Sequence, residues 1–281
     1  MNSDRTNYDL LYNPRLTVAE FPQIIERWQR ESEKARAALD GYLDVPYGPD
    51  EMETMDIFRS RGQSKGLLMF IHGGYWRAFD KKDLTFVVPA LAGAGITVAI
   101  PNYALCPKVQ VRDIVMQMVQ ACAWLYRNGA NFGAPAFRLH LCGHSAGGHL
   151  AAMMLACLWP TYARDLPRKV VQAAMSISGV YDLRDIVKVA SVNSDVRLTE
   201  KSALEVSPAF LPPASDAPFH TAVGEKENEG FHIQNRLIAQ NWKKVHKADV
   251  VCAGENHFTE LDQFSDPNSR LSRAVIEMME S

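Results

Sequence analysis

The sequence lacks the features that mark several large classes of protein. No apolar run is long enough to span a membrane, and the polar start of the chain, MNSDRTNYDLLYNPR, has no apolar stretch suited to a signal peptide. The formal net charge is only −2, which gives no electrostatic reason to expect binding to nucleic acid or to an anionic membrane. These absences favour a protein that acts on a small molecule. The sequence leaves open whether the protein forms a homodimer.

Metal motifs and paired cysteines are also missing. No CxxC or HExxH spacing occurs, so we expect neither a structural nor a catalytic metal site. The cysteines number only five, an odd count in a chain of 281 residues, and three lie in or against predicted core elements. This usage is typical of reduced, buried thiols in a cytoplasmic protein. The five are Cys106, Cys122, Cys142, Cys157 and Cys252.

The chain has enough length and apolar content, 47%, for one large domain of strands and helices. No repeat, low-complexity tract or long linker divides it, so we predict a single domain over residues 1–281. Short apolar strands alternate with helical patterns from about residue 55, which predicts a mostly parallel sheet with helices on both faces. An amphipathic helix is predicted ahead of the sheet, at about 16–40. The predicted strands are 55–58, 66–72, 96–103, 137–143, 172–179, 219–224 and 248–254.

The stretch LHLCGHSAGGHLAAMM contains a G-x-S-x-G motif centred on Ser145. An apolar strand precedes the motif and a long helical pattern follows it, which is the context that a nucleophilic serine requires. The sharp turn from strand to helix lifts the hydroxyl clear of the sheet, and the helix start offers free N–H groups to developing negative charge. We therefore predict that Ser145 is a nucleophile.

A serine hydroxyl needs a base, and the base needs a carboxylate that orients it. In hydrolases with this motif the chain order is serine, acid, histidine, so a histidine after Ser145 is expected. His257 lies in a loop directly after the last predicted strand and is the predicted base. The acid belongs in the loop after the preceding strand, where spacing alone does not choose among three glutamates. The candidates are Glu225, Glu227 and Glu229, with Asp182 one strand earlier as a further carboxylate that more commonly would cap a helix.

An early loop, FIHGGYW, supplies what else acyl transfer requires. Backbone N–H donors that stabilise the oxyanion are each worth roughly 3–4 kcal/mol. We expect one donor at Ala146, directly after the serine, and the others among Gly73, Gly74 and Tyr75, since glycine leaves neighbouring amides unshielded. Tyr75 and Trp76 are predicted to wall the substrate pocket, against the alternative that they pack in the core. His72 is expected to hold the loop by hydrogen bonding.

With these residues in place, the chain resembles the kynurenine formamidase (arylformamidase) branch of the α/β-hydrolases. The resemblance covers most of the chain and is carried by YNPR, HGGYW with DKKD, NYALCP, GHSAGGHLAA, SGVYDL and NHF. In that branch the acid is followed four residues on by Phe and seven on by Gln. Glu227 has Phe231 and Gln234 at those places, so the resemblance implies a Ser145–His257–Glu227 triad, with Glu where many members have Asp.

The resemblance also implies an α/β-hydrolase fold and hydrolysis of N-formyl-L-kynurenine to formate and kynurenine, without a cofactor. Similar chains cleave other small aryl substrates by the same mechanism, so an esterase, amidase or carbamate hydrolase is the alternative. A binding protein of the same fold without catalysis is a remote alternative, because the serine, the histidine, an acid and the glycine loop are all present.

Overall fold

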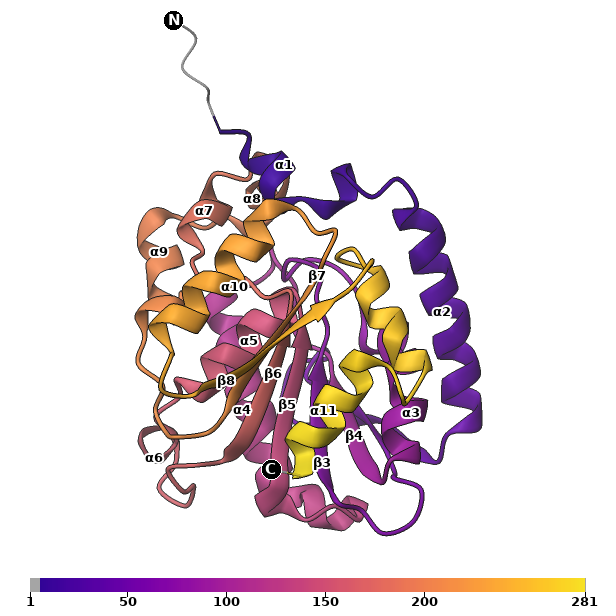
Figure 1. Cartoon of the computed structure of the whole chain (residues 1–281). Coiled ribbons are helices and arrows are strands. Elements are labelled where there is room, and N and C mark those ends of the chain that lie inside the picture. The colour runs from indigo at the N-terminus through magenta and orange to yellow at the C-terminus, as the bar shows by residue number, and fades with distance from the viewer. Residues whose placement is uncertain (1–5, 281) are drawn as a thin grey trace, which may run out of the picture.

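A computed structural model of the chain describes residues 6–280 (Figure 1). Residues 1–5 and 281, which the predicted domain includes, lie outside the described part. Eight strands form one sheet in the order β1-β2-β4-β3-β5-β6-β7-β8. β1 and β2 pair antiparallel, β2 joins β4 antiparallel, and all later pairings are parallel. The strands are β1 (Gly41–Pro46), β2 (Thr54–Phe58), β3 (Gly66–Ile71), β4 (Ile96–Pro101), β5 (Leu139–His144), β6 (Val171–Ile177), β7 (Phe219–Gly224) and β8 (His246–Cys252).

Helices cover both faces of the sheet, so two apolar layers sandwich it. Successive residues of β3 point to opposite faces, and Met69 packs in one layer while Leu68 and Phe70 pack in the other. One layer is formed with α4 (Val111–Asn128), α5 (Ala146–Leu155) and α10 (Glu229–Asn241). The other is formed with α2 (Phe21–Ala38), α3 (Val88–Gly93) and α11 (Arg270–Glu280).

Shorter elements lie in the connections. The short α-helices are α1 (Tyr8–Tyr12), α6 (Trp159–Tyr162), α7 (Arg184–Val187), α8 (Ala190–Val196) and α9 (Glu200–Glu205). The 3₁₀ helices are η1 (Pro14–Leu16), η2 (Lys81–Val87), η3 (Gly129–Phe132), η4 (Ala136–Arg138), η5 (Pro208–Phe210) and η6 (Thr259–Ser265). No helix among residues 6–280 is both long and apolar enough to cross a membrane.

The predicted parallel sheet with helices on both faces is confirmed, and so is the helix ahead of it. Between β3 and β4, residues 84–95 form an apolar segment that the sequence pattern predicts as one helix, whereas the structure divides this region into η2 and α3. Pro89 lies in the first turn of α3, where a missing N–H costs nothing, so the helix starts afresh there. The antiparallel strand β1 was not predicted, because its side chains are mostly exposed and show no apolar alternation.

Candidate active site

Ser145 occupies the turn between β5 and α5. Its backbone has φ 56° and ψ −117°, a conformation that residues other than glycine rarely adopt, and its N–H donates to the Ile177 carbonyl at 2.8 Å. A Cβ at Gly143 would lie 2.1 Å from the Gly147 carbonyl oxygen, and one at Gly147 would lie 2.0 Å from the Ile71 carbonyl oxygen. The motif glycines are therefore required by close backbone packing, which holds the serine turn in place.

His257 and Glu227 meet at the carboxyl end of the sheet. The Nδ1 atom of His257 lies 2.7 Å from the Glu227 Oε2 atom, and both residues are buried. Because a carboxylate accepts, Nδ1 carries the proton, which leaves Nε2 as an acceptor. The ring of Phe231 lies 4.3 Å from the His257 ring between centroids and packs against it. Phe231, four residues after Glu227, thus places an aromatic ring where it restricts the His257 imidazole.

The other candidate carboxylates have different partners. Glu225 accepts from the Gly254 N–H at 2.7 Å, and Glu229 pairs with Arg236 on the surface. Asp182 accepts from the backbone N–H and the guanidinium of Arg184, the first residue of α7, although Leu183 is the N-cap residue of that helix. Of the four, Glu227 is the one that contacts His257. Tertiary contact therefore selects the acid that the sequence spacing left open.

Sequence reasoning missed a second buried carboxyl beside Glu227. The Ser178 hydroxyl lies 2.5 Å from Glu260 Oε1 and is also hydrogen-bonded to Glu227 Oε1. One hydroxyl proton cannot serve two carboxylates, so one of the acids is protonated. Burial, followed by the charge of Glu227, raises the pKa of Glu260 well above its usual range. Glu260 is therefore the neutral acid and donates to Ser178, which in turn donates to Glu227.

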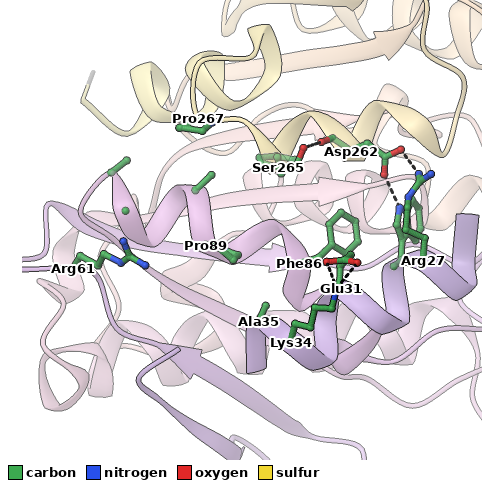
Figure 2. Close-up of a pocket in the computed structure, with 15 residues that line it drawn as sticks. Arg27, Glu31, Lys34, Ala35, Arg61, Phe86, Pro89, Asp262, Ser265 and Pro267 are labelled. Carbon is green, nitrogen blue, oxygen red and sulfur yellow. Dashed lines mark hydrogen bonds and ion pairs between the residues drawn. The ribbon is translucent and has the colours of Figure 1, made fainter. Parts of the chain in front are cut away.

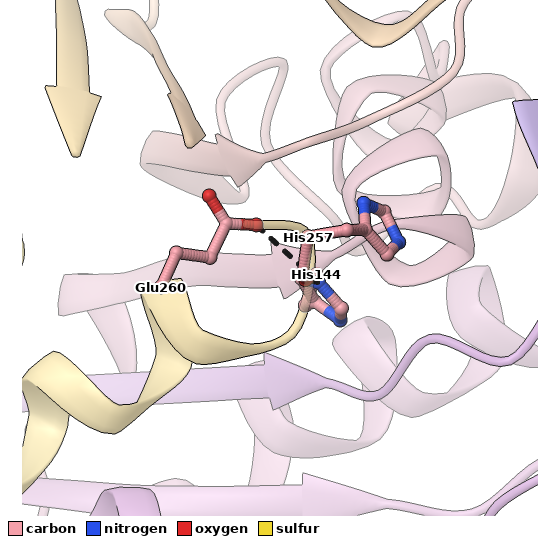
Figure 3. A group of neighbouring side chains, drawn as sticks. All are labelled: His144, His257 and Glu260. Carbon is pink, nitrogen blue, oxygen red and sulfur yellow. Dashed lines mark hydrogen bonds and ion pairs between the residues drawn. The ribbon is translucent and has the colours of Figure 1, made fainter. Parts of the chain in front are cut away.

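His144 completes this buried group (Figure 3). Burial lowers the pKa of His144 well below its usual range, so its imidazole is neutral. Its Nε2–H donates to the His257 carbonyl at 2.8 Å and lies 3.4 Å from Glu260 Oε1. His144 thus fixes the backbone of the residue whose ring Glu227 orients. It lies next to the serine in sequence, and no local pattern shows that it reaches a loop 113 residues on.

His144, His257 and Glu260 are close enough together to be compared with a metal site. The potential ligand atoms of these three residues are poorly suited to bind a metal ion. The Nε2 atom of His144 is committed to a carbonyl, Nδ1 of His257 is committed to Glu227, and Glu260 is a neutral acid. A metal would need these groups deprotonated and free.

The glycine loop after β3 lies against Ser145. A Cβ on Gly73 would lie 3.0 Å from that of Ser145, and Gly74 adopts φ +98° with Tyr75 and Trp76 also at positive φ. The N–H groups of Gly73, Gly74, Tyr75 and Ala146 donate to no acceptor within residues 6–280. His72 holds the loop as expected, because its Nδ1 donates to the Gly73 carbonyl at 2.9 Å while its ring stacks on Tyr103.

The two aromatics after the glycines take different places. Tyr75 lines the cavity beside Ser145, and its hydroxyl donates to the Tyr12 carbonyl. Trp76 does not line that cavity, contrary to the expectation that it walls the pocket. Its indole is fully buried and meets the His149 ring edge-on, with centroids 5.0 Å apart. The core-packing alternative therefore describes Trp76.

The cavity beside Ser145 is small. Its volume is about 20 Å³, which is room for about one water molecule. Within residues 6–280 no hydrogen bond joins the Ser145 hydroxyl to His257, and such bonds are often long before substrate binds. The cavity is lined by Asn13, Pro14, Arg15, Gly74, Tyr75, Arg77, Phe79, His144, Ser145, His257 and Phe258.

Residues 7–17, the N-terminal segment, cover this cavity. Several side chains tie the segment to the rest of the domain. Asn228 Nδ2 donates to the Leu10 carbonyl at 2.7 Å, and Asn13 Nδ2 donates to the Ser191 hydroxyl at 2.8 Å. The sequence signal that could have found this role is YNPR itself, which was assigned only as part of a family resemblance. Nothing local to it indicates that it lies over the serine.

A larger groove, of about 930 Å³, lies between α2, α3 and η6 (Figure 2). Trp28 and Phe86 form part of its apolar wall, and an Arg27–Asp262 ion pair lies at its edge. It contains none of the predicted site residues and no nucleophile with an adjacent base. Because chemistry needs those groups at the reacting atom, the smaller cavity at Ser145 is the candidate active site.

Comparisons with known proteins identify relatives of this chain. Residues 68–260 match a family model described as an alpha/beta hydrolase fold. Kynurenine formamidase from Danio rerio is 30% identical over an alignment of 281 residues. The alignment covers 95% of this chain and 92% of that protein. The chain belongs to the kynurenine formamidase branch of the α/β-hydrolases. The Salmo salar kynurenine formamidase is 30% identical over 260 residues, covering 88% of this chain and 85% of that one.

The fold has a close match among solved structures. A crystal structure from Silicibacter sp. TM1040, of a protein with a provisional thioesterase name, superposes with a TM-score of 0.85. It is 27% identical in sequence and covers 99% of this chain and 100% of its own. The predicted fold and branch are thereby confirmed, and this member of the branch is a hydrolase.

Proposed function

We propose that this hydrolase cleaves a small aryl formamide of the N-formylkynurenine type, with Ser145 as nucleophile, His257 as base and Glu227 as orienting acid. The observation that carries the proposal is the buried contact between Glu227 and His257 Nδ1, 2.7 Å long, beside the strained turn of Ser145. Relatives named kynurenine formamidases, similar over most of the chain, support the substrate class.

The proposed reaction has two stages. The Ser145 hydroxyl attacks the formyl carbon while His257 Nε2 takes its proton, and Glu227 stabilises the imidazolium through Nδ1. The oxyanion accepts hydrogen bonds from Ala146 and from N–H groups of the Gly73–Gly74–Tyr75 loop. Collapse of the tetrahedral intermediate breaks the C–N bond, and the imidazolium protonates the departing aryl amine. Water, activated by His257, then hydrolyses the formyl ester and releases formate.

The size of the cavity favours a formyl group on the acyl side. A cavity of about 20 Å³ accepts the hydrogen of a formyl group more readily than an alkyl chain, which would have to displace buried side chains. The aromatic rings at the cavity are Tyr75, Phe79 and Phe258, and they are suited to pack against a flat leaving group. With Trp76 in the core, these three rings replace the wall that the sequence predicted.

A second candidate function is hydrolysis of a short aryl ester or thioester by the same residues. It is favoured by the Silicibacter structure, whose provisional name is thioesterase and which matches this chain over its whole length. An ester or amide of a short acid would use the same nucleophile and oxyanion donors. The two candidates differ in the leaving atom and in the acyl group, and a matched substrate panel separates them.

The panel pairs formanilide with acetanilide, and phenyl formate with the acetate, butyrate and octanoate esters. We expect kcat/KM to be highest for formyl substrates and to fall steeply beyond about two to four carbons, because each added methylene must be accommodated in a packed site. The variant Phe137→Ala serves as a control and should show the same substrate preference as the wild type, since Phe137 is 66% exposed and lies outside the cavity. Rapid hydrolysis of the esters with no hydrolysis of formanilide would reject the formamidase function in favour of the esterase or thioesterase function. Preference for octanoyl over formyl esters would contradict the small acyl site.

A further inference from the structure

The NYALCP stretch carries part of the family resemblance, yet no step of the proposed reaction uses it. Its tyrosine, Tyr103, follows β4, is fully buried and does not line the cavity at Ser145. The Tyr103 ring stacks on that of His72, with centroids 4.3 Å apart and planes inclined by 10°. Tyr103 therefore packs against the first residue of the glycine loop from outside the cavity.

The hydroxyl of Tyr103 contacts two carbonyls of this loop. Its oxygen lies 2.9 Å from the carbonyl oxygen of His72 and 3.2 Å from that of Gly73. A carbonyl only accepts, so the hydroxyl is the donor and its single proton is shared between the two. Burial raises the pKa of Tyr103 far above the ordinary phenol value, so the hydroxyl keeps its proton at neutral pH.

The Gly73 carbonyl also accepts from the side chain of His72. The Nδ1 atom of His72 lies 2.9 Å from this carbonyl oxygen. Burial lowers the pKa of His72 to about 4, so the imidazole is neutral at neutral pH and carries one proton. Because the acceptor lies at Nδ1, the proton is on that nitrogen. Two side chains thus converge on the Gly73 carbonyl, and one of them also reaches the carbonyl before it.

Each of these carbonyls belongs to the same peptide group as an N–H of the proposed oxyanion loop. The His72 carbonyl shares its peptide plane with the Gly73 N–H, and the Gly73 carbonyl shares its plane with the Gly74 N–H. Neither N–H donates to an acceptor within residues 6–280. A hydrogen bond to the carbonyl fixes the plane and polarises the peptide group, which makes its N–H a stronger donor.

We propose that Tyr103 is a positioning residue for the oxyanion site, where its hydroxyl orients and polarises the peptide groups that present the N–H donors of Gly73 and Gly74. This inference rests on the proposed function and adds to it a residue that touches no reacting atom. The loop needs such support, because Gly74, Tyr75 and Trp76 are three successive residues at positive φ. Backbone in this conformation persists only where surrounding contacts hold it.

The test removes the hydroxyl alone. Tyr103→Phe keeps the ring that stacks on His72. Tyr47→Phe is the matched control, because Tyr47 is also buried, lies outside the cavity and donates to a backbone carbonyl, that of Asn102, at 2.6 Å. Each variant therefore loses one buried hydrogen bond between a tyrosine and the backbone. The measurements are urea unfolding, steady-state kinetics on formanilide and phenyl acetate, and inhibition by methylboronic acid, whose adduct with a nucleophilic serine is tetrahedral and anionic.

We expect Tyr103→Phe to lower kcat on both substrates about 10- to 100-fold and to change KM less than about two-fold, because loss of a complete oxyanion donor costs about 10²- to 10³-fold and here the donors are only weakened. The inhibition constant of methylboronic acid should rise by a comparable factor, since the adduct carries its negative oxygen where the transition state does. This constant does not depend on the amount of folded enzyme, so it separates weaker oxyanion binding from partial unfolding. Tyr47→Phe should leave kcat, KM and the inhibition constant within about two-fold of the wild type.

Three results would overturn the proposal. Wild-type values of kcat and of the inhibition constant in Tyr103→Phe would show that the hydroxyl does not support the oxyanion donors. Equal losses of kcat in Tyr103→Phe and Tyr47→Phe, with no change in the inhibition constant, would show only the general cost of a lost buried hydrogen bond. A loss confined to KM would place Tyr103 in substrate binding instead. If the wild type cleaves phenyl acetate but not formanilide, the proposed formamidase function fails, and the ester and boronate measurements still decide the role of Tyr103.

Discussion

The carboxylate of Glu227 contacts Nδ1 of His257 at 2.7 Å, while its other oxygen accepts from the Gly224 N–H at 2.8 Å and from the Ser178 hydroxyl. A buried carboxylate with this many donors is held in one orientation. It can therefore fix the imidazole tautomer and stabilise an imidazolium. Glu227 lies in the loop after β7, and contacts at both of its carboxylate oxygens hold the side chain against His257.

Substitution of the nucleophile is the first prediction. Ser145→Ala should lower kcat by several orders of magnitude and abolish labelling by an organophosphonate, because no other hydroxyl lies in the serine turn. The measurements are steady-state kinetics and intact-mass analysis after exposure to the probe. Near-normal turnover by a well-folded Ser145→Ala protein would refute the proposed mechanism.

The acid prediction compares two glutamates of the same loop. Glu227→Gln should reduce kcat about 10³- to 10⁴-fold, because an amide cannot stabilise the imidazolium and favours the wrong tautomer. Glu225→Gln is the matched control and should change kcat less than a few-fold, since Glu225 accepts only from the Gly254 N–H on the surface. Greater damage from Glu225→Gln would mean that the contact seen at His257 is not the catalytic one.

Glu260 should make stability depend on pH. Its pKa is raised above the ordinary glutamate value of 4.5 by burial and by Glu227, so the folded state holds a proton that the unfolded state loses. The stability that Glu260 contributes is therefore complete below pH 4.5 and is lost as pH rises toward the folded-state pKa. In that window the unfolding free energy of the wild type should fall relative to that of Glu260→Gln by up to about 1.4 kcal/mol per pH unit.

Urea unfolding of both proteins at a series of pH values measures this difference. The amide of glutamine can still donate to Ser178, so Glu260→Gln should retain activity, whereas Ser178→Ala should lower kcat and leave KM nearly unchanged. A stability difference that stays flat with pH would show that Glu260 is ionised in the folded protein. His144 and Glu227 also face this carboxyl, and both are retained in the variant.

Chelation should leave activity intact. The nitrogen of His144 nearest Glu260 and Nδ1 of His257 are both held by hydrogen bonds within the protein, and Glu260 is a neutral acid. Dialysis against EDTA, followed by assay with and without added zinc, measures this. If EDTA abolished activity and zinc restored it, the reaction would require a metal ion and the proposed mechanism would be wrong.

Local spacing carried the prediction of the serine turn and of the sheet. A strand, a G-x-S-x-G turn and a helix are consecutive in the chain, and the glycine positions are required by contacts between neighbouring residues such as Gly143 and Gly147. Chain order then pointed to His257, because a loop after the last strand of a parallel sheet opens at the same edge as the serine. The serine turn depends on short-range geometry and His257 on the order of the strands, and both can be derived from a single sequence.

Tertiary structure decided what depends on distant contacts. The family resemblance pointed to Glu227, but spacing within this sequence did not separate it from Glu225 and Glu229, and the folded loop after β7 brings Glu227 to His257. Trp76 is fully buried in the core and does not line the cavity. The N-terminal segment reaches Asn228, more than 200 residues away in the chain, to cover Ser145. Contacts of this kind leave no periodic pattern in the sequence, because the two partners are far apart in the chain and meet only when it has folded.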